Sequence, residues 1–332
     1  MISDRQEQLL KLIVENYIKT AKPVSSKALC DIMNCSSATV RNEMAALEDC
    51  GLLEKTHTSS GRVPSDKGYR YYVDNIMEAK ELTGEDMLKL QTIFKNNSLV
   101  LSDAIVKSME IVSELTNYTA VVLGTASEDN LIVRVEAIPI SPGNMTAIII
   151  TDKGHVENRH VVIDEMISQS EVKQTVDIIN KLIVGTPLSE VSKTLEFEVK
   201  PVIGKYVKQH EALYNAFYNA FSEFTFHPDI KVAGQAKLLG EPEFDDVNKI
   251  RNILNKFEDR ELIKNIRASE DGINVYIGSE NMIDDDISVI KTYYTNNGVK
   301  GTIALIGPKR MEYDRAEALL NYIQENIRKM NG

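Results

Sequence analysis

The sequence predicts an α+β protein that begins with a winged helix-turn-helix and continues into a larger α/β domain with an insertion. The first observation is the stretch from Ser36 to Tyr72, which has the pattern of a capped helix, a strand, a glycine-containing turn, a short returning strand and another helix. The second is a series of strand-like segments between residues 119 and 163, with two more near the C-terminus. Helical segments flank these strands at both ends, so the strands are expected to form one interrupted domain.

Two helices are expected before this stretch. The first covers about residues 4–20, where apolar residues recur at helical spacing, and Pro23 prevents its continuation. The second begins at its N-cap, Ser25, and ends before Asn34, a residue that tolerates the left-handed conformation of a helix end. Cys35 leads directly into the next helix, and this succession is that of a helix-turn-helix.

The helix that begins at Ser36 is the predicted recognition helix. Apolar residues at i, i+4 and i+7, from Val40 to Leu47, form one buried stripe. The opposite face is small and polar, which suits entry into a major groove, with Arg41 donating to guanine or phosphate and Asn42 pairing with adenine. For this helix taken alone, a merely solvated surface helix is an equal alternative. The residues of this helix expected to contact DNA are Ser37, Ala38, Thr39, Arg41, Asn42 and Ala45.

A β-wing is expected directly after the recognition helix. The segment from Leu52 to His57 is typical of a strand, residues 58–62 of a flexible turn with a cation at its tip, and Val63-Pro64 of a return edge, where proline is tolerated. Ser65 then caps a further helix. Basic residues outnumber acids from Lys55 to Tyr72, which suits phosphate. The residues of this segment expected to contact DNA are Lys55, His57, Arg62, Lys67 and Arg70.

Two segments carry a resemblance to a known family. The stretches SSATVRNEMAALEDCGLLEKTHTSSGRVPSDKGYRYYVD, from Ser36 to Asp74, and GTIALIGPKRMEYDRA, from Gly301 to Ala316, resemble the two signature regions of HrcA, the heat-inducible transcription repressors of bacterial chaperone operons. The resemblance implies a winged helix-turn-helix followed by a GAF-like domain that is split by an inserted dimerisation domain.

The composition is that of an ordinary soluble chain. Of 332 residues, 43% are hydrophobic and 26% are charged, enough for two or three cores. No apolar run approaches the length needed to cross a bilayer, and the N-terminal residues lack the apolar segment of a signal peptide. A cytoplasmic protein is therefore expected.

The net charge of −11 is distributed unevenly. Residues 1–80 contain 11 basic and 11 acidic residues, whereas the remainder contains 27 and 38. An acidic body would be repelled by DNA and would leave contact to the N-terminal domain, although an acidic soluble protein of any function could have the same balance.

The three cysteines, Cys30, Cys35 and Cys50, are confined to the N-terminal region, where His57 could complete a set of four metal ligands. Their spacing is not that of a zinc knuckle, so structural cysteines are favoured and no metal or other cofactor is expected.

Enzyme motifs are also missing from the sequence, which has neither a glycine-rich phosphate loop nor a G-x-S-x-G elbow. The acidic run Asp284 to Asp286 is most simply a solvated loop. An enzyme is therefore not expected.

The whole chain is therefore expected to divide into four parts. Residues 1–80 form the winged helix-turn-helix, and residues 81–100 form a linker with a central helix. Residues 101–164 and 263–332 form a discontinuous GAF-like domain, which residues 165–262 interrupt as an inserted dimerisation domain. Docking of the winged domain through the linker is expected to be marginal, because contacts between domains are usually polar and modest.

In the insert, Ser168 and Glu171 form a capping box, and the segment after Pro201 is rich in aromatic residues at helical spacing. This stripe is either intramolecular core or a subunit interface. The residues proposed for a dimer interface are Tyr214, Phe217, Tyr218 and Phe221.

The predicted function is that of a repressor. The resemblance implies a homodimer that binds an inverted repeat in double-stranded DNA, called CIRCE in the family, upstream of chaperone operons, and it implies GroEL chaperonin as a partner. The alternative is a metabolite-responsive winged-helix regulator with a ligand-binding GAF-like domain.

Overall fold

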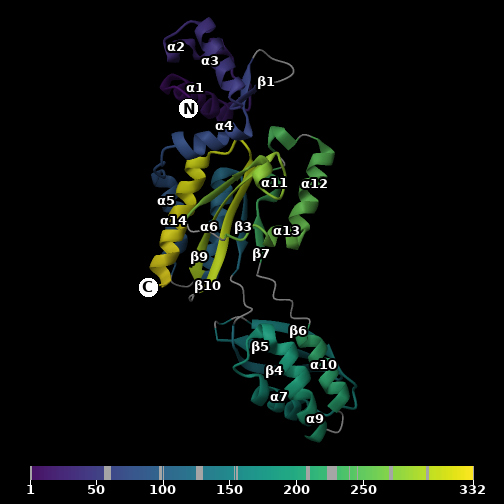
Figure 1. The fold of residues 1–332 in the computed structure, drawn as a ribbon. Helices are drawn as coiled ribbons and strands as arrows, with labels where there is room; N and C mark the ends of the chain where they lie inside the picture. The colour runs from purple at the N-terminus through teal and green to yellow at the C-terminus, as the bar shows by residue number, and fades with distance from the viewer. Residues whose placement is uncertain are drawn as a thin grey trace. The chain divides into compact units, whose positions relative to one another are not determined.

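The computed structural model describes all residues except 1, 56–60, 97, 98, 100, 125–129, 153, 155, 207–209, 223–229, 239, 245, 269–271, 297, 298 and 332. The chain forms two compact units (Figure 1). The main unit comprises residues 1–125 and 229–332, and the inserted unit comprises residues 126–228. Within the described ranges, the structure has no helix that is both long enough and apolar enough to cross a membrane.

The main unit begins with the helices that the sequence predicts. Helix α1 spans Asp4–Thr20, α2 spans Ser26–Met33 and α3 spans Ser37–Asp49. Each is preceded by a serine whose hydroxyl accepts a hydrogen bond from a backbone N–H of the first turn, which stabilises the helix start. Asn34 ends α2 in the left-handed region, with a φ of 49°. The helix-turn-helix is therefore confirmed.

The wing follows α3. Strand β1 (Leu53–Lys55) pairs with β2 (Arg62–Pro64) in antiparallel register, and α4 (Asp66–Tyr71) continues into a π-helical turn, η1 (Tyr72–Ile76). The turn expected between the strands falls mostly outside the described residues. Gly68 allows α4 to pack closely on the wing, since a Cβ there would lie 2.1 Å from the carbonyl oxygen of Leu52.

A five-stranded antiparallel sheet forms the centre of the remaining main unit, which we call the α/β body. Its strand order is β7-β3-β10-β9-β8. The strands are β7 (Ile230–Ala233), β3 (Thr119–Leu123), β10 (Val299–Pro308), β9 (Ile287–Asn296) and β8 (Asn274–Ile277). A short helical turn, η5 (Gly278–Glu280), follows β8.

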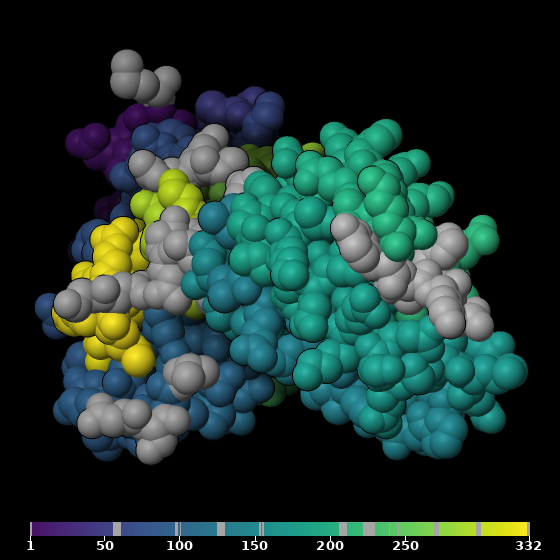
Figure 2. All heavy atoms as spheres, turned by 90° about the horizontal axis from the view of Figure 1, so that it is seen from below, coloured from purple at the N-terminus to yellow at the C-terminus, as the bar shows by residue number. Residues whose placement is uncertain are grey.

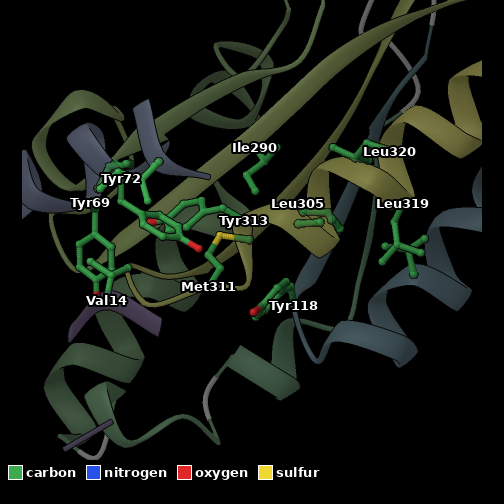
Figure 3. Packing of buried hydrophobic residues seen from close by; sticks show 14 of the residues in the cluster. Val14, Tyr69, Tyr72, Tyr118, Ile290, Leu305, Met311, Tyr313, Leu319 and Leu320 are labelled. Carbon is green, nitrogen blue, oxygen red and sulfur yellow. The ribbon is translucent and has the colours of Figure 1, made fainter. Parts of the chain in front are cut away.

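Helices cover both faces of this sheet because its residues point alternately to either side. On one face, Val122, Ile290 and Ile303 pack with buried residues of α6 (Leu101–Thr116) and α14 (Tyr313–Asn331), as Figure 3 shows for part of this core. On the other face, Val121 and Ala304 pack with the segment between β7 and β8. That segment contains α11 (Gln235–Leu238), η4 (Pro242–Phe244), α12 (Val247–Glu258) and α13 (Arg260–Lys264).

The expected linker is largely helical and packed. Helix α5 (Gly84–Phe94) contacts α6 and α14, and Leu90 is fully buried. The expectation of marginal docking for the winged domain is wrong, because its buried residues and those of α6 and α14 belong to one continuous core. Tyr69 of α4 and Tyr313 of α14 are both fully buried and their ring centroids lie 6.1 Å apart (Figure 3).

The inserted unit has its own sheet and its own core. Figure 2 draws its surface as teal to green spheres. Its antiparallel strands are β4 (Ile132–Ser141), β5 (Asn144–Thr151) and β6 (Val156–Val162), in that order across the sheet. Its helical segments are α7 (Gln169–Ile183), η2 (Leu188–Glu190), α8 (Val191–Thr194), η3 (Leu195–Val199), α9 (Lys200–Tyr206) and α10 (His210–Ser222). The predicted capping box of Ser168 and Glu171 opens α7.

The expected boundaries of the insert, residues 165–262, differ from those of the inserted unit, residues 126–228. The three strands between residues 132 and 162 pair only with one another, whereas β7 and the helices up to residue 264 belong to the α/β body. The sequence places these strands in the α/β body because they follow β3 closely along the chain, but their pairing assigns them to the inserted unit. Two strands of the body, β7 and β9, were not predicted at all. Strand β9 is buried along most of its length and therefore lacks the alternation of a half-exposed strand.

Candidate nucleic-acid interface

Helix α3 is held by its apolar side. Val40, Met44 and Leu47 are buried in the core of the winged domain, as the helical spacing predicts. Glu43 binds α3 to the start of α1, because its carboxylate pairs with Arg5 at 2.7 Å and accepts a hydrogen bond from Gln6 at 2.9 Å. The orientation of α3 about its own axis is therefore fixed.

The opposite face of α3 is exposed to solvent. Ala38, Arg41, Asn42 and Ala45 are all exposed, so two polar side chains lie beside two small ones on one helical surface. The exposure expected for these four residues is confirmed, while their contact with DNA stays a prediction. Such a surface can approach base edges closely, because alanine occupies little space and arginine and asparagine offer planar hydrogen-bonding groups.

Ser37 and Thr39 are half-buried at the start of α3. The Ser37 hydroxyl lies 2.9 Å from that of Ser26 on α2, and the Thr39 hydroxyl lies 3.0 Å from that of Ser36. Both hydroxyls thus take part in local hydrogen bonds that fix the turn between α2 and α3. Backbone N–H groups at this helix start are oriented towards an approaching anion such as phosphate.

Lys55 and Lys67 are the exposed cations of the wing region. Lys55, on β1, is 63% exposed in its side chain and lies 3.2 Å from Glu48. Lys67 lies on the exposed side of α4. His57 lies outside the described residues.

Arg62 is not at the tip of the wing, contrary to expectation. It is the first residue of β2, its side chain is 11% exposed, and its Nε lies 2.8 Å from the Glu48 carboxylate of α3. Its backbone also pairs with Val24. Burial alone would raise the pKa of Glu48, but Lys55 and Arg62 outweigh it and lower that pKa. Arg62 therefore joins the wing to α3 and is not available to phosphate in this arrangement.

Arg70 is likewise paired within the protein, although its side chain is 29% exposed. Its guanidinium pairs with Glu280 of the α/β body and with Asp74 one turn further along, and it donates to the carbonyl of Val275. The hydrogen bond to Glu280 raises the pKa of Arg70 further. The expected role of Arg70 as a phosphate contact is thus at odds with its position, because most of its donors already bind the protein.

The aromatic residues proposed for the dimer interface belong to the core of the inserted unit. Tyr214, Phe217 and Phe221 on α10 are 5%, 1% and 1% exposed, and they pack with α7 and the sheet. Side chains buried inside one subunit cannot supply contact area to another, so this assignment is wrong for these three. Tyr218 is half-buried and stacks on Tyr214 at 5.5 Å between ring centroids. The intramolecular alternative accounts for the stripe.

Among the residues that the structure describes, a range that leaves out His57, no group of three or more potential metal ligands comes together. The Sγ of Cys30 donates to the backbone oxygen of Ser26, which suits a structural thiol. The acidic run is ion-paired in part, since Asp284 lies 2.8 Å from Lys256 and Asp286 lies 2.7 Å from Lys249, both on α12.

Sequence reasoning gave no role to Lys309 and Arg310, although they belong to the second signature region. Lys309 pairs with Asp66 of the winged domain at 2.8 Å, and Arg310 donates to the backbone oxygen of Ile18 at 3.3 Å. Both lie in the turn between β10 and α14. The GPKRMEY run marked this turn as a distinctive segment of the sequence. Its contacts could not be predicted, because the partners Asp66 and Ile18 are distant in sequence.

Two family models and two curated relatives all match this chain to HrcA. Residues 1–76 match the family model "Winged helix-turn-helix transcription repressor, HrcA DNA-binding", and residues 102–316 match "HrcA protein C terminal domain". The heat-inducible transcription repressor HrcA of Bacillus pumilus (strain SAFR-032) is 34% identical, covering 98% of this chain and 97% of the relative. That of Lysinibacillus sphaericus is 38% identical with the same coverage.

A solved crystal structure described only as a hypothetical protein has a TM-score of 0.65 and 25% identity, covering 99% of this chain and 98% of that one. The matching families are transcription repressors and not enzymes, in agreement with the sequence analysis. The chain belongs to the HrcA family of heat-inducible transcription repressors.

Proposed function

We propose that this chain represses chaperone operons by binding, as a homodimer, an inverted-repeat operator of the CIRCE type. The single observation that carries the proposal is the exposed face of α3, on which Arg41 and Asn42 lie between Ala38 and Ala45. Asparagine can bind adenine in a bidentate manner and arginine can bind guanine, so the two side chains can distinguish base pairs in the major groove. The exposed Lys55 and Lys67 supply cations for the phosphate backbone.

The charge distribution supports contact through the winged domain alone. Residues 1–80 are neutral overall, and all of the net charge of −11 comes from the remainder. An acidic body is repelled by phosphate, which favours approach of the DNA from the side of α3 and the wing.

Homodimerisation follows from an operator with two-fold symmetry, because one winged domain recognises only one half-site. The inserted unit offers a surface for it. Its helices pack on one face of the β4–β5–β6 sheet, and the other face carries exposed apolar side chains, including Ile138 (47% exposed), Val156 (52%) and Val162 (67%). A second copy placed on this face would bury them, as is usual for the apolar centre of a homodimer interface.

The β4 edge of this sheet is less suited to association than its face. On edge strand β4, the side chain of Asn180 makes two hydrogen bonds to the backbone of Val135. It accepts one from the N–H and donates the other to the carbonyl oxygen, both at 2.7 Å. Pro139, further along β4, has no N–H to donate. A protected edge such as β4 resists pairing with another strand, and we therefore propose the face over the β4 edge as the dimer contact.

Regulation by heat and by GroEL chaperonin is part of the same proposal. The relatives are named heat-inducible repressors, and a chaperonin that favours exposed apolar surface would recognise a chain whose sheet face is uncovered.

A metabolite-responsive regulator is the competing hypothesis, and it requires a ligand cavity in the α/β body. A pocket of about 280 Å³ lies beside α6 and strands β3 and β7. Elsewhere the sheet is covered by fully buried side chains, among them Ile303 and Leu305 on one face and Ala304 and Ile306 on the other. This packing favours the repressor.

The proposal is tested by replacing Asn42 on the exposed face of α3. Asn42→Ala should weaken binding to an inverted-repeat operator by about 1–3 kcal/mol and leave binding to a scrambled duplex nearly unchanged, because only base contacts distinguish the two. Gel-shift titrations of both duplexes measure the difference. Asn321→Ala, at an exposed asparagine of α14, is the matched control and should alter neither titration. Equal losses on both duplexes would show that α3 does not read bases, and equal affinity of the unmodified protein for both would refute operator binding.

A further inference from the structure

The seam between the winged domain and the α/β body is bridged by charged groups from both sides. From the winged domain, Asp66 and Arg70 lie one turn apart on α4. From the body, Glu280 of η5 pairs with Arg70, and Lys309 pairs with Asp66 at 2.8 Å. The two pairs have opposite polarity, so a rotation of α4 that exchanged their partners would bring like charges together.

Arg310 adds a third attachment at another helix of the winged domain. Its guanidinium is anchored within the body by Glu243 at 2.5 Å and by Glu241, and it donates to the carbonyl of Ile18 in the last turn of α1. The positive charge of Arg310 also interacts favourably with the negative C-terminal end of the α1 dipole. The attachments therefore reach two helices, α1 and α4, which restricts rotation about either one.

The close approach at this seam is built into the backbone. Gly278, with a φ of +53°, lies where a Cβ would be 2.2 Å from an Asp66 carboxylate oxygen. At the same seam the ring of Tyr69 lies tilted against that of Tyr313 (Figure 3). The buried hydroxyl of Tyr69 has no hydrogen-bond partner among the described protein atoms. The aromatic contact thus supplies buried apolar area, and the ion pairs and their hydrogen bonds supply directional contacts.

We propose that Arg70, Lys309 and Arg310 form a clasp that fixes the orientation of the winged domain on the α/β body, and that the clasp sets the half-site spacing which the dimer accepts. The inference rests on the proposed function. In a dimer each α3 must enter the major groove at a defined distance from the other, and a winged domain with a fixed orientation transmits the geometry of the body to α3. Arg70, Lys309 and Arg310 are positioning residues, since they act through α1 and α4 and not on DNA.

Glu280→Gln is the most informative variant because Glu280 lies on the body and because glutamine keeps an oxygen that can accept from the N–H of Ile277, as Glu280 does at 2.9 Å. Its matched control is Glu325→Gln, at an exposed glutamate of α14. Arg70→Gln breaks the same pair from the winged side. Three synthetic duplexes serve as probes: a CIRCE-type inverted repeat, the same repeat with about five base pairs, half a helical turn, added between the half-sites, and a single half-site.

Both Glu280→Gln and Arg70→Gln should weaken binding to the natural spacing by about tenfold, a change readily measured as a dissociation constant. Both should reduce the preference for natural over altered spacing and leave half-site binding unchanged. If Arg70 instead contacts phosphate, Arg70→Gln weakens half-site binding and Glu280→Gln does not, which overturns the clasp. A lower melting temperature with unchanged spacing preference also overturns it, because the pair would then be merely structural. Failure of the unmodified protein to prefer the inverted repeat would count against the proposed function itself.

Discussion

Arg62 could contact phosphate or hold the wing in place, and its burial beside Glu48 favours the structural role. On the sequence it is a cation beside a flexible turn, while in the structure it is nearly buried and paired with Glu48. The pair connects β2 with α3, the helix on which the proposed readout depends. Its function is therefore to hold the wing against α3 and only indirectly to bind DNA.

Arg62→Ala should lower the free energy of unfolding by about 1.5–3 kcal/mol, the range for a hydrogen bond to a charged group. Because the pKa of Glu48 is lowered in the folded state, its ionised form stabilises the fold above the carboxyl range, and this contribution is lost as the pH falls below about 4.3. The difference between variant and unmodified protein, measured by urea unfolding, should therefore shrink in acid.

Lys67→Ala is the control for Arg62→Ala, since Lys67 is an exposed cation of the same domain. It should leave stability nearly unchanged and weaken binding to operator and scrambled DNA alike. Normal stability of Arg62→Ala together with a uniform loss of DNA affinity would restore the original interpretation of Arg62 as a phosphate contact.

At the scale of elements, local signals were sufficient for the helices of the winged domain. Ser25, Ser36 and Ser65 cap helices, and Asn34 ends one, because caps depend on residues a few positions apart. Strand pairing depends on distant partners. The segment from Ile132 to Val162 looks locally like any set of antiparallel strands, and only its pairing separates it from β3. The partners of Arg62 and Arg70 were missed for the same reason.

The face of the β4–β5–β6 sheet replaces α10 as the expected dimer surface. Ile138→Glu combined with Val162→Glu should give a folded monomer, because both side chains are exposed within one chain and a charge there is solvated until a second copy covers it. Light scattering would report the mass and circular dichroism the fold. Affinity for the inverted repeat should fall while half-site binding remains.

Met166→Glu is the matched control for the sheet face, because Met166 is 86% exposed and lies outside the strands of the inserted unit. It should remain dimeric. If the double variant is still a dimer, the subunits associate through another surface.

At the scale of the whole molecule, the distribution of cores indicates which parts unfold together. The winged domain shares one core with α6 and α14, so it should melt with the α/β body. The inserted unit is a separate compact unit, and its core is formed by its own residues. The inserted unit is the smaller of the two, and smaller domains bury less of their surface. It should therefore melt first and release the dimer.

Mild heating should then abolish operator binding below the main melting transition, through loss of the dimer and not through release of the winged domain. Calorimetry and operator occupancy, followed on one sample across temperature, should show occupancy falling with the earlier of two transitions. Added chaperonin should restore the binding fraction on cooling.

Two core variants assign the transitions. Phe217→Ala, in the core of the inserted unit, should cost about 3–5 kcal/mol and lower the first transition by about 10 °C or more, together with the loss of operator occupancy. Phe244→Ala, in the core of the α/β body, is the matched change and should lower the second transition alone. If occupancy persists up to the melting of the α/β body, or if both variants shift one common transition, heat does not act through the inserted unit, and control by chaperonin or by a ligand becomes the better account of derepression.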